Sequence, residues 1–171
     1  MRNADTSARQ WVGSGGAHGG AGGGAGAKIE AVPDTYPNLR AVVLDATDAR
    51  ALGEFYRLLL GYEYSPGHGE PDPDGDDWLV LREPSGTSPR LAIQRVDELP
   101  TATWPEPVVP QQLHLDMTVA DIDELARQHD RALALGASEL EDRSGDADEP
   151  LYVLADPAGH PFCIFVSPDH P

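Results

Sequence analysis

Cysteine is almost absent from this chain: Cys163 is the single one among 171 residues. An intramolecular disulfide is therefore excluded. Because the first residues also lack the basic-then-apolar order of a secretory signal, we expect a reducing, cytoplasmic location. No apolar run approaches the roughly 20 residues of a membrane-spanning helix, so we expect no membrane association. P-loop, dinucleotide-binding and Gly-x-Ser-x-Gly motifs are also missing, which argues against the enzyme classes built on them.

Positive charge is scarce as well. The chain has 12 Lys and Arg against 29 Asp and Glu, which gives a formal net charge of −17 and a pI near 4.4. Such a surface repels phosphate groups, so we expect neither nucleic acid nor an anionic membrane as a partner. Solubility is the ordinary reason for this acidity. Hydrophobic residues make up 40% of the chain, enough for a packed core.

Glycine is concentrated in one place, since residues 1–27 contain nine of the 18 glycines. Such a segment cannot bury enough apolar surface to offset the entropy lost on ordering. The sequence therefore predicts a flexible tail and lead-in followed by one folded domain. The predicted boundaries are 1–37 for the tail and lead-in, 38–167 for the domain (first module 38–98, connector 99–110, second module 111–167) and 168–171 for a short end.

The domain contains an internal repeat. Residues 41–61 and 114–136 each run from a strand pattern through an aspartate and a helical pattern to Leu-Gly. Each copy is followed by two strand patterns around a Pro-x-Gly turn. A repeated β-α-β-β unit predicts an α+β fold made of two similar modules.

Hydrophobic periodicity gives the expected elements. Helices are predicted at Ala49–Leu60, after an N-cap at Thr47 or Asp48, and at Ile122–Leu135, after Asp121, with Gly61 and Gly136 as their ends. The predicted strands are 40–46, 62–65, 77–83, 90–96, 112–119, a short one around Ser138, 151–155 and 162–166, with polar loops at 66–77 and 141–149.

Two motifs carry a family resemblance. Asp48, then Phe55-Tyr56 and Leu60-Gly61, together with Asp-Pro-Ala-Gly-His-Pro at 156–161, resemble the vicinal oxygen chelate superfamily, and its glyoxalase-like subgroup in particular. The resemblance covers about residues 38–167. It implies two βαβββ modules whose mostly antiparallel sheets curl into a cup, with the helices outside. It also implies small-molecule ligands, as in bleomycin resistance proteins and dioxygenases, and pairing into homodimers.

The same resemblance implies four metal-ligand positions, which fall on Ala41, Gln94, His114 and Cys163. Alanine cannot bind a metal, and the set offers no carboxylate for oxygen-preferring ions. We therefore expect no cofactor. The alternative is a divalent metal held by His114, Gln94 and Cys163, which is fewer strong ligands than zinc sites use.

Strand alternation puts His114 and Asp116 on one face, about 6–7 Å apart at Cα. A histidine beside a carboxylate can act as a general base, so this pair is the candidate catalytic pair. The alternative is that Asp116 bonds a backbone group or an arginine, and that His114 is an ordinary pocket residue. Both remain open at this point.

Four further residues are candidate substrate contacts: Gln94, Trp78, Trp104 and Cys163. The two tryptophans either line the cup or belong to an ordinary core. Cys163 is either a nucleophile activated by His114 or a small buried hydrophobe. His160, in the Pro-x-Gly turn, is expected at the surface or as a turn-stabilising residue.

Three hypotheses for function remain. The leading one is a glyoxalase-like protein that binds a small organic molecule in the cup without the full family metal site. The second is a lyase, isomerase or dioxygenase of the same superfamily that uses His114. The third is a non-catalytic interaction domain with a collapsed cup.

Overall fold

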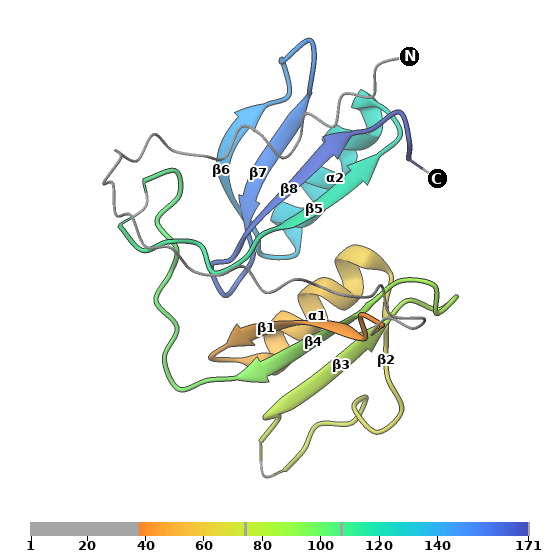
Figure 1. Cartoon of the computed structure of the whole chain (residues 1–171), viewed down its shortest axis with the longest axis vertical. Helices are drawn as coiled ribbons and strands as arrows, with labels where there is room; N and C mark the ends of the chain where they lie inside the picture. The colour runs from red at the N-terminus through yellow and green to blue at the C-terminus, as the bar shows by residue number, and fades with distance from the viewer. Residues whose placement is uncertain (1–37, 74, 107, 171) are drawn as a thin grey trace, which may run out of the picture. The chain divides into compact units, whose positions relative to one another are not determined.

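The computed structural model describes residues 38–73, 75–106 and 108–170, which belong to one compact unit, Asn38–Pro171 (Figure 1). The flexible tail predicted for residues 1–37 lies outside the described residues. Neither described helix is long and apolar enough to cross a membrane.

Helix α1 (Ala49–Leu60) has the predicted bounds. The Asp48 side chain accepts a hydrogen bond from the Ala51 backbone N–H at 2.9 Å, and Gly61, at φ 68°, ends the helix in the left-handed conformation that glycine adopts without strain. One face of α1 is buried because its apolar residues recur at helical spacing: Leu52, Phe55, Tyr56 and Leu59.

Helix α2 (Ile122–Ala134) repeats this design one residue shorter than predicted. Asp121 caps it by accepting a hydrogen bond from the Glu124 backbone N–H at 2.8 Å. Its buried residues are only Leu125 and Ala132, so α2 contributes less apolar surface to the core than α1 does.

The strands form two open four-stranded sheets, one per module. Sheet A has the order β1-β4-β3-β2, and sheet B has the equivalent order β5-β8-β7-β6. Each sheet joins its first and last strands in parallel and its other neighbours antiparallel. The predicted α+β class with two βαβββ modules is therefore confirmed. The strands are β1 (Ala41–Ala46), β2 (Glu63–Tyr64), β3 (Trp78–Arg82), β4 (Arg90–Arg95), β5 (Leu115–Val119), β6 (Ser138–Arg143), β7 (Leu151–Ala155) and β8 (Pro161–Val166).

Two strands differ from the prediction by more than one residue at an end. Strand β5 begins at Leu115 rather than at residue 112, so His114 immediately precedes it. Strand β6 runs to Arg143 and takes in the start of the predicted polar loop. Its sequence, SELEDR, has no apolar alternation because it is a largely exposed edge strand, and its pairing with β7 defines it.

The main core lies between the helices and the sheets, and both modules contribute to it. Side chains from β1, β3, β4 and α1 join others from β5, α2, β7 and β8 in one cluster. The Phe55 ring of α1 meets the Phe162 ring of β8 edge-on, with centroids 6.0 Å apart. Since alternate strand residues point to opposite faces, the other face of each sheet is turned away from this core, and we call it the open face.

Candidate functional site

The open face of sheet A carries a pocket. On β1, Leu44 and Ala46 are buried in the core, so Val43 and Asp45 point to the open face. The strand register places Asp45 beside Gln94 of β4. A pocket of about 510 Å³ opens here, and we call it the sheet A pocket; it is lined by Val43, Asp45, Gln94, Leu99, Gln112, Leu113 and His160.

Both modules and the connector contribute to the sheet A pocket. Leu99 and Gln112 lie at the two ends of the segment that joins the modules, and His160 belongs to the turn between β7 and β8. The lining has one carboxylate, two amides, one imidazole and three aliphatic side chains, and neither Lys nor Arg is among these residues. Such a surface combines apolar contact area with a few polar groups that fix a ligand's orientation.

A buried polar network supports this pocket from behind. The Asp156 carboxylate accepts hydrogen bonds from the Tyr56 hydroxyl at 2.8 Å and from His160 Nδ1 at 2.9 Å. Its other oxygen accepts from the backbone N–H groups of Ala158 and His160. Of the two alternatives predicted for His160, the turn-stabilising role agrees with these bonds. The surface position is wrong, because the residue is buried. The network also links α1 of the first module to the last turn of the second.

Burial keeps Tyr56 protonated in this network. Removal from water, followed by the neighbouring Asp156 charge, holds the pKa of the Tyr56 hydroxyl well above 10. The hydroxyl is therefore a donor throughout the physiological pH range, which suits the carboxylate it faces.

The open face of sheet B carries most of the other predicted residues. Asp116 of β5 is registered beside Cys163 of β8, and Asp116 Oδ2 lies 3.8 Å from His114 Nε2. That separation exceeds a hydrogen bond, so the pair interacts directly only as an ion pair, when His114 is protonated. Trp104 and Phe165 pack against Leu151, Val153 and Cys163, in a second and smaller apolar cluster.

The environment of Cys163 favours its reading as a small buried hydrophobe. Burial first, and the nearby Asp116 charge second, raise the pKa of the thiol to about 12. A thiol with this pKa is protonated near neutrality, whereas both nucleophilic attack and metal binding need the thiolate.

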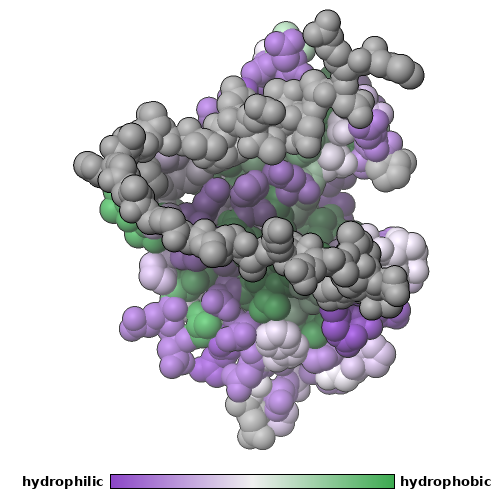
Figure 2. All heavy atoms as spheres, viewed as in Figure 1, coloured by the Kyte–Doolittle hydropathy of each residue, from purple (hydrophilic) through white to green (hydrophobic). Residues whose placement is uncertain are grey.

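The predicted residues thus divide between two surfaces. His114, Asp116, Trp104 and Cys163 belong to sheet B and its cover. Trp78 and Gln94 are neighbours on the open face of sheet A, where Trp78 is 43% exposed. Figure 2 shows hydrophobic next to hydrophilic surface over this sheet. Of these six predicted site residues, Gln94 alone is among the residues that line the sheet A pocket.

Sequence reasoning missed three polar residues of that pocket: Asp45, Gln112 and His160. Asp45 had a usable signal, because it is the one charged residue in the strand AVVLDA, at an open-face position. His160 and Gln112 had none, since only the packing of turn, connector and sheet brings them together.

The residues at the superfamily's metal positions do not fit a divalent ion. In the second module, Asp116 lies two residues after His114 and is paired with Cys163. In the first module, Val43 lies two residues after Ala41 and is paired with Ala92. The structural counterpart of Cys163 is therefore Ala92, and Gln94 lies two residues further along β4. Two alanines, one histidine and a protonated thiol make a poor donor set. Within residues 38–170, apart from 74 and 107, no group of three or more His, Cys, Asp or Glu is placed to hold a metal ion.

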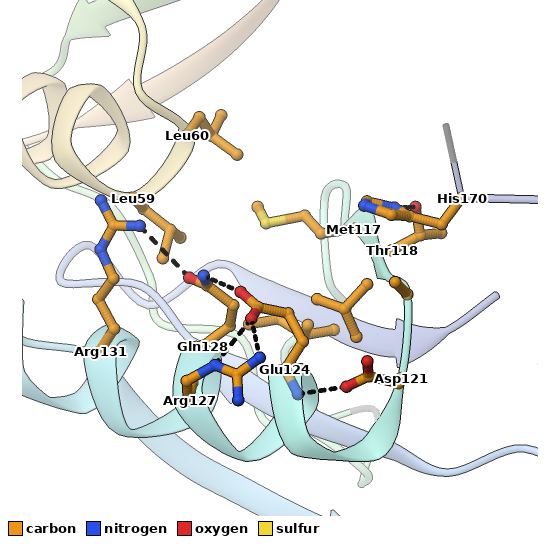
Figure 3. A pocket seen from close by; sticks show the side chains of 13 residues that line it. Leu59, Leu60, Met117, Thr118, Asp121, Glu124, Arg127, Gln128, Arg131 and His170 are labelled. Carbon is orange, nitrogen blue, oxygen red and sulfur yellow. Dashed lines mark hydrogen bonds and ion pairs between the residues drawn. The ribbon is translucent and has the colours of Figure 1, made fainter.

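A second pocket, of about 440 Å³, lies where the end of α1 meets β5 and α2 (Figure 3). Leu59, Leu60, Met117 and Ile164 supply apolar surface. Its polar side chains largely bond one another: Glu124 accepts from Arg127 and from Gln128, and Thr118 pairs with His170. This pocket offers fewer uncommitted polar groups than the sheet A pocket, which we therefore take as the candidate site.

Comparisons with solved structures agree with this architecture. A glyoxalase/bleomycin resistance protein/dioxygenase family enzyme from Burkholderia phytofirmans PsJN aligns with a TM-score of 0.57 and 15% identity, over 76% of this chain and 98% of that one. A glyoxalase-related enzyme from Fulvimarina pelagi aligns with a TM-score of 0.56 and 19% identity, over 80% of this chain and 92% of that one. The fosfomycin resistance protein FosX from Mesorhizobium loti aligns with a TM-score of 0.54 and 11% identity, over 80% of this chain and 94% of that one. At these identities the likeness shows the fold alone.

Sequence comparison supplies the family. No curated protein matches the chain. A family model described as a glyoxalase-like domain matches residues 41–165, well over half of the chain. The matched span contains both βαβββ modules and the Asp156–Pro161 turn. The chain therefore belongs to the glyoxalase-like domain family, within the vicinal oxygen chelate superfamily.

Proposed function

We propose that this protein binds a small organic molecule in the sheet A pocket and that its activity does not pass through a metal at the superfamily's ligand positions. One observation carries the proposal: the pocket of about 510 Å³ joins residues of both modules and the connector around a few polar side chains. Its volume lies within the range of about 300–1,000 Å³ that small-molecule sites occupy.

The donor set supports the second half of the proposal. Alanine stands at two of the four structurally matched positions, and the thiol at a third is protonated at neutral pH. Metal analysis after dialysis of the purified full chain against Zn²⁺, Ni²⁺ or Fe²⁺ tests this directly. We expect no stoichiometric metal to survive a chelator wash; one retained equivalent, lost in His114→Ala, would contradict the proposal.

Filling the pocket tests the first half. Val43 is 40% exposed on the open face, so Val43→Trp places a large ring in the pocket with little cost to the core. Ile122→Trp, on the exposed side of α2, is the matched control. In ligand-observed NMR with a set of small phenols, amides and amidines, compounds that bind the unmodified chain should bind the control and lose binding to Val43→Trp. Equal binding to all three proteins would place the ligand elsewhere.

A second candidate rests on the pair His114 and Asp116. Their 3.8 Å approach supports a lyase, isomerase or dioxygenase in which His114 acts as a base. The protonated state of Cys163 gives this alternative no nucleophile at that position. If the protein turns over a compound found in the screen, loss of turnover in His114→Ala at unchanged melting temperature would favour the enzyme.

Two broader expectations stay proposals. A cytoplasmic location follows from the sequence, and a homodimer follows from the family resemblance. Sedimentation of the purified chain measures the second. The interaction-domain hypothesis required a collapsed cup, and the open sheet A pocket gives it no support.

A further inference from the structure

We propose that Nε2 of His160 is a hydrogen-bond acceptor of the sheet A pocket, and that the pocket therefore selects a small ligand carrying clustered N–H donors, of the amidine, guanidine or primary amine class. This inference rests on the proposed function, because it names the ligand class of the same pocket. It goes further by assigning a role to a histidine that the turn motif alone marks as structural.

The first step is the state of the Asp156 carboxylate. Its side chain has no exposed surface, and it accepts four hydrogen bonds. One oxygen takes the backbone N–H groups of Ala158 and His160, at 2.9 and 3.0 Å; the other takes the Tyr56 hydroxyl and His160 Nδ1, at 2.8 and 2.9 Å. Four donors fill the acceptor sites of a carboxylate, so this group holds its neighbours in one arrangement.

The second step is the tautomer of His160. Because Asp156 is the acceptor, His160 Nδ1 carries the hydrogen that joins them. In a neutral imidazole with the hydrogen on Nδ1, Nε2 has a lone pair and no hydrogen. As long as the imidazole is neutral, the carboxylate on Nδ1 therefore leaves Nε2 as an acceptor, in the way that a carboxylate orients an imidazole in many catalytic sites.

The third step is the position of Nε2. The His160 side chain is only 5% exposed, and the residue lines the sheet A pocket. No hydrogen bond reaches Nε2 from the described part of the chain. A donor on a ligand or a water molecule in the pocket is therefore the natural partner of Nε2.

The remaining polar groups set the ligand class. Asp45 adds a carboxylate, Gln94 and Gln112 add adaptable amides, and neither Lys nor Arg lines the pocket among the described residues. Two acceptors without a cation favour a ligand rich in N–H donors and disfavour a carboxylate or phosphate. The aliphatic side chains of Val43, Leu99 and Leu113 suit a flat apolar body on that ligand.

Benzamidine is a probe with these properties, and benzoate is its matched opposite: the two share a ring and differ in the group it carries. We expect benzamidine, and not benzoate, to bind the full chain in an NMR titration. Long-range proton–nitrogen spectra of histidine-labelled protein should show His160 with its hydrogen on Nδ1, and benzamidine should shift its Nε2 signal.

Two variants separate the roles. His160→Asn keeps an amide N–H for Asp156 where Nδ1 stands, and removes the Nε2 acceptor. Benzamidine is a cation at neutral pH, so loss of its hydrogen bond to Nε2 should weaken binding about 10- to 100-fold. Asp45→Asn, at an exposed carboxylate, should weaken binding about 2- to 5-fold. His170→Asn is the control, because His170 bonds Thr118 away from the sheet A pocket, and it should leave binding unchanged.

Several outcomes would overturn the inference. They are a hydrogen on Nε2, whether in place of the one on Nδ1 or in addition to it, benzamidine affinity unaffected by His160→Asn, tighter binding of benzoate, and no benzamidine binding at all. If other compounds bind the unmodified chain and lose binding to Val43→Trp, the inference fails while the proposed function stands. If no compound of the screen binds in the sheet A pocket, both fail.

Discussion

Removing the Tyr56 hydroxyl tests whether the buried network joins the two modules. Tyr56→Phe keeps the ring, which is fully buried and meets Phe55 edge-on at 5.0 Å between centroids, and deletes only the donor to Asp156. A hydrogen bond to a charged partner contributes about 1.5–3 kcal/mol. For a domain of this size, that loss lowers the melting temperature by roughly 5–12 °C.

The same variant has a pH signature. The hydroxyl ionises near pH 10 in the unfolded chain, and its pKa is well above 10 in the folded one. Above about pH 10 the unfolded chain therefore holds fewer protons than the folded chain, and stability falls as the pH rises further. Tyr56→Phe should lose that part of the alkaline decline.

Urea denaturation followed by circular dichroism measures both effects, at pH 7 and at several values between pH 9 and 11. Tyr62→Phe is the control, because no described hydrogen bond involves its hydroxyl. A stability change for Tyr56→Phe no larger than that of Tyr62→Phe would refute the hydrogen-bonded network and, with it, the fixed tautomer of His160.

Three further predictions follow from the same structure. Cys163, with its thiol pKa raised to about 12, should resist iodoacetamide at pH 8 in the folded protein and react after unfolding, as shown by mass spectrometry. Gly159→Ala should destabilise the fold by about 1–3 kcal/mol in urea denaturation, because φ is +96° and the new Cβ would lie 2.8 Å from the Thr101 methyl carbon. Arg50→Ala should release the loop that contains Asp76, since Arg50 bonds that carboxylate at 2.6 Å, and protease cleavage within residues 66–77 should become faster.

Matched changes make these three predictions specific. Gly145→Ala is the control for Gly159→Ala, because no atom of the described residues lies within 4 Å of its added Cβ and its φ is not positive. Arg57→Ala is the control for Arg50→Ala, since Arg57 lies on the same helix and, among the described residues, bonds only Glu54, three residues away. Rapid alkylation of folded Cys163, equal losses for both glycine variants, or equal cleavage of both arginine variants would contradict the respective reasoning.

Local chemistry made much of the fold predictable. Asp48 and Asp121 cap the helices because an aspartate oxygen reaches the N–H groups of the first turn, and the apolar spacing of α1 selects its buried face. Because the two modules repeat the same pattern, each helix or strand predicted in one module supports its counterpart in the other. The strand predicted around Ser138 is present as β6, but its extension to Arg143 was missed because these residues are held by pairing with β7 and not by an apolar face of their own.

The site was predicted less well, for a physical reason. The structure does place His114, Asp116 and Cys163 close together, because alternation along β5 and the family resemblance both apply to neighbouring strands. The sheet A pocket joins β1, the connector and the last turn, segments more than 40 residues apart in the chain. No local sequence pattern predicts that these segments lie side by side.

The sequence by itself determined the two helices, most strands and the repeated module, because these depend on the chemistry of each residue and its near neighbours. Tertiary structure alone decided that His160 is buried, that Asp156 holds its Nδ1, and that Asp45 and Gln94 share a pocket with it. The two modules meet through the packing of Phe55 on Phe162 and the bond of Tyr56 to Asp156. Contacts between residues about 100 positions apart arise only when the whole core closes.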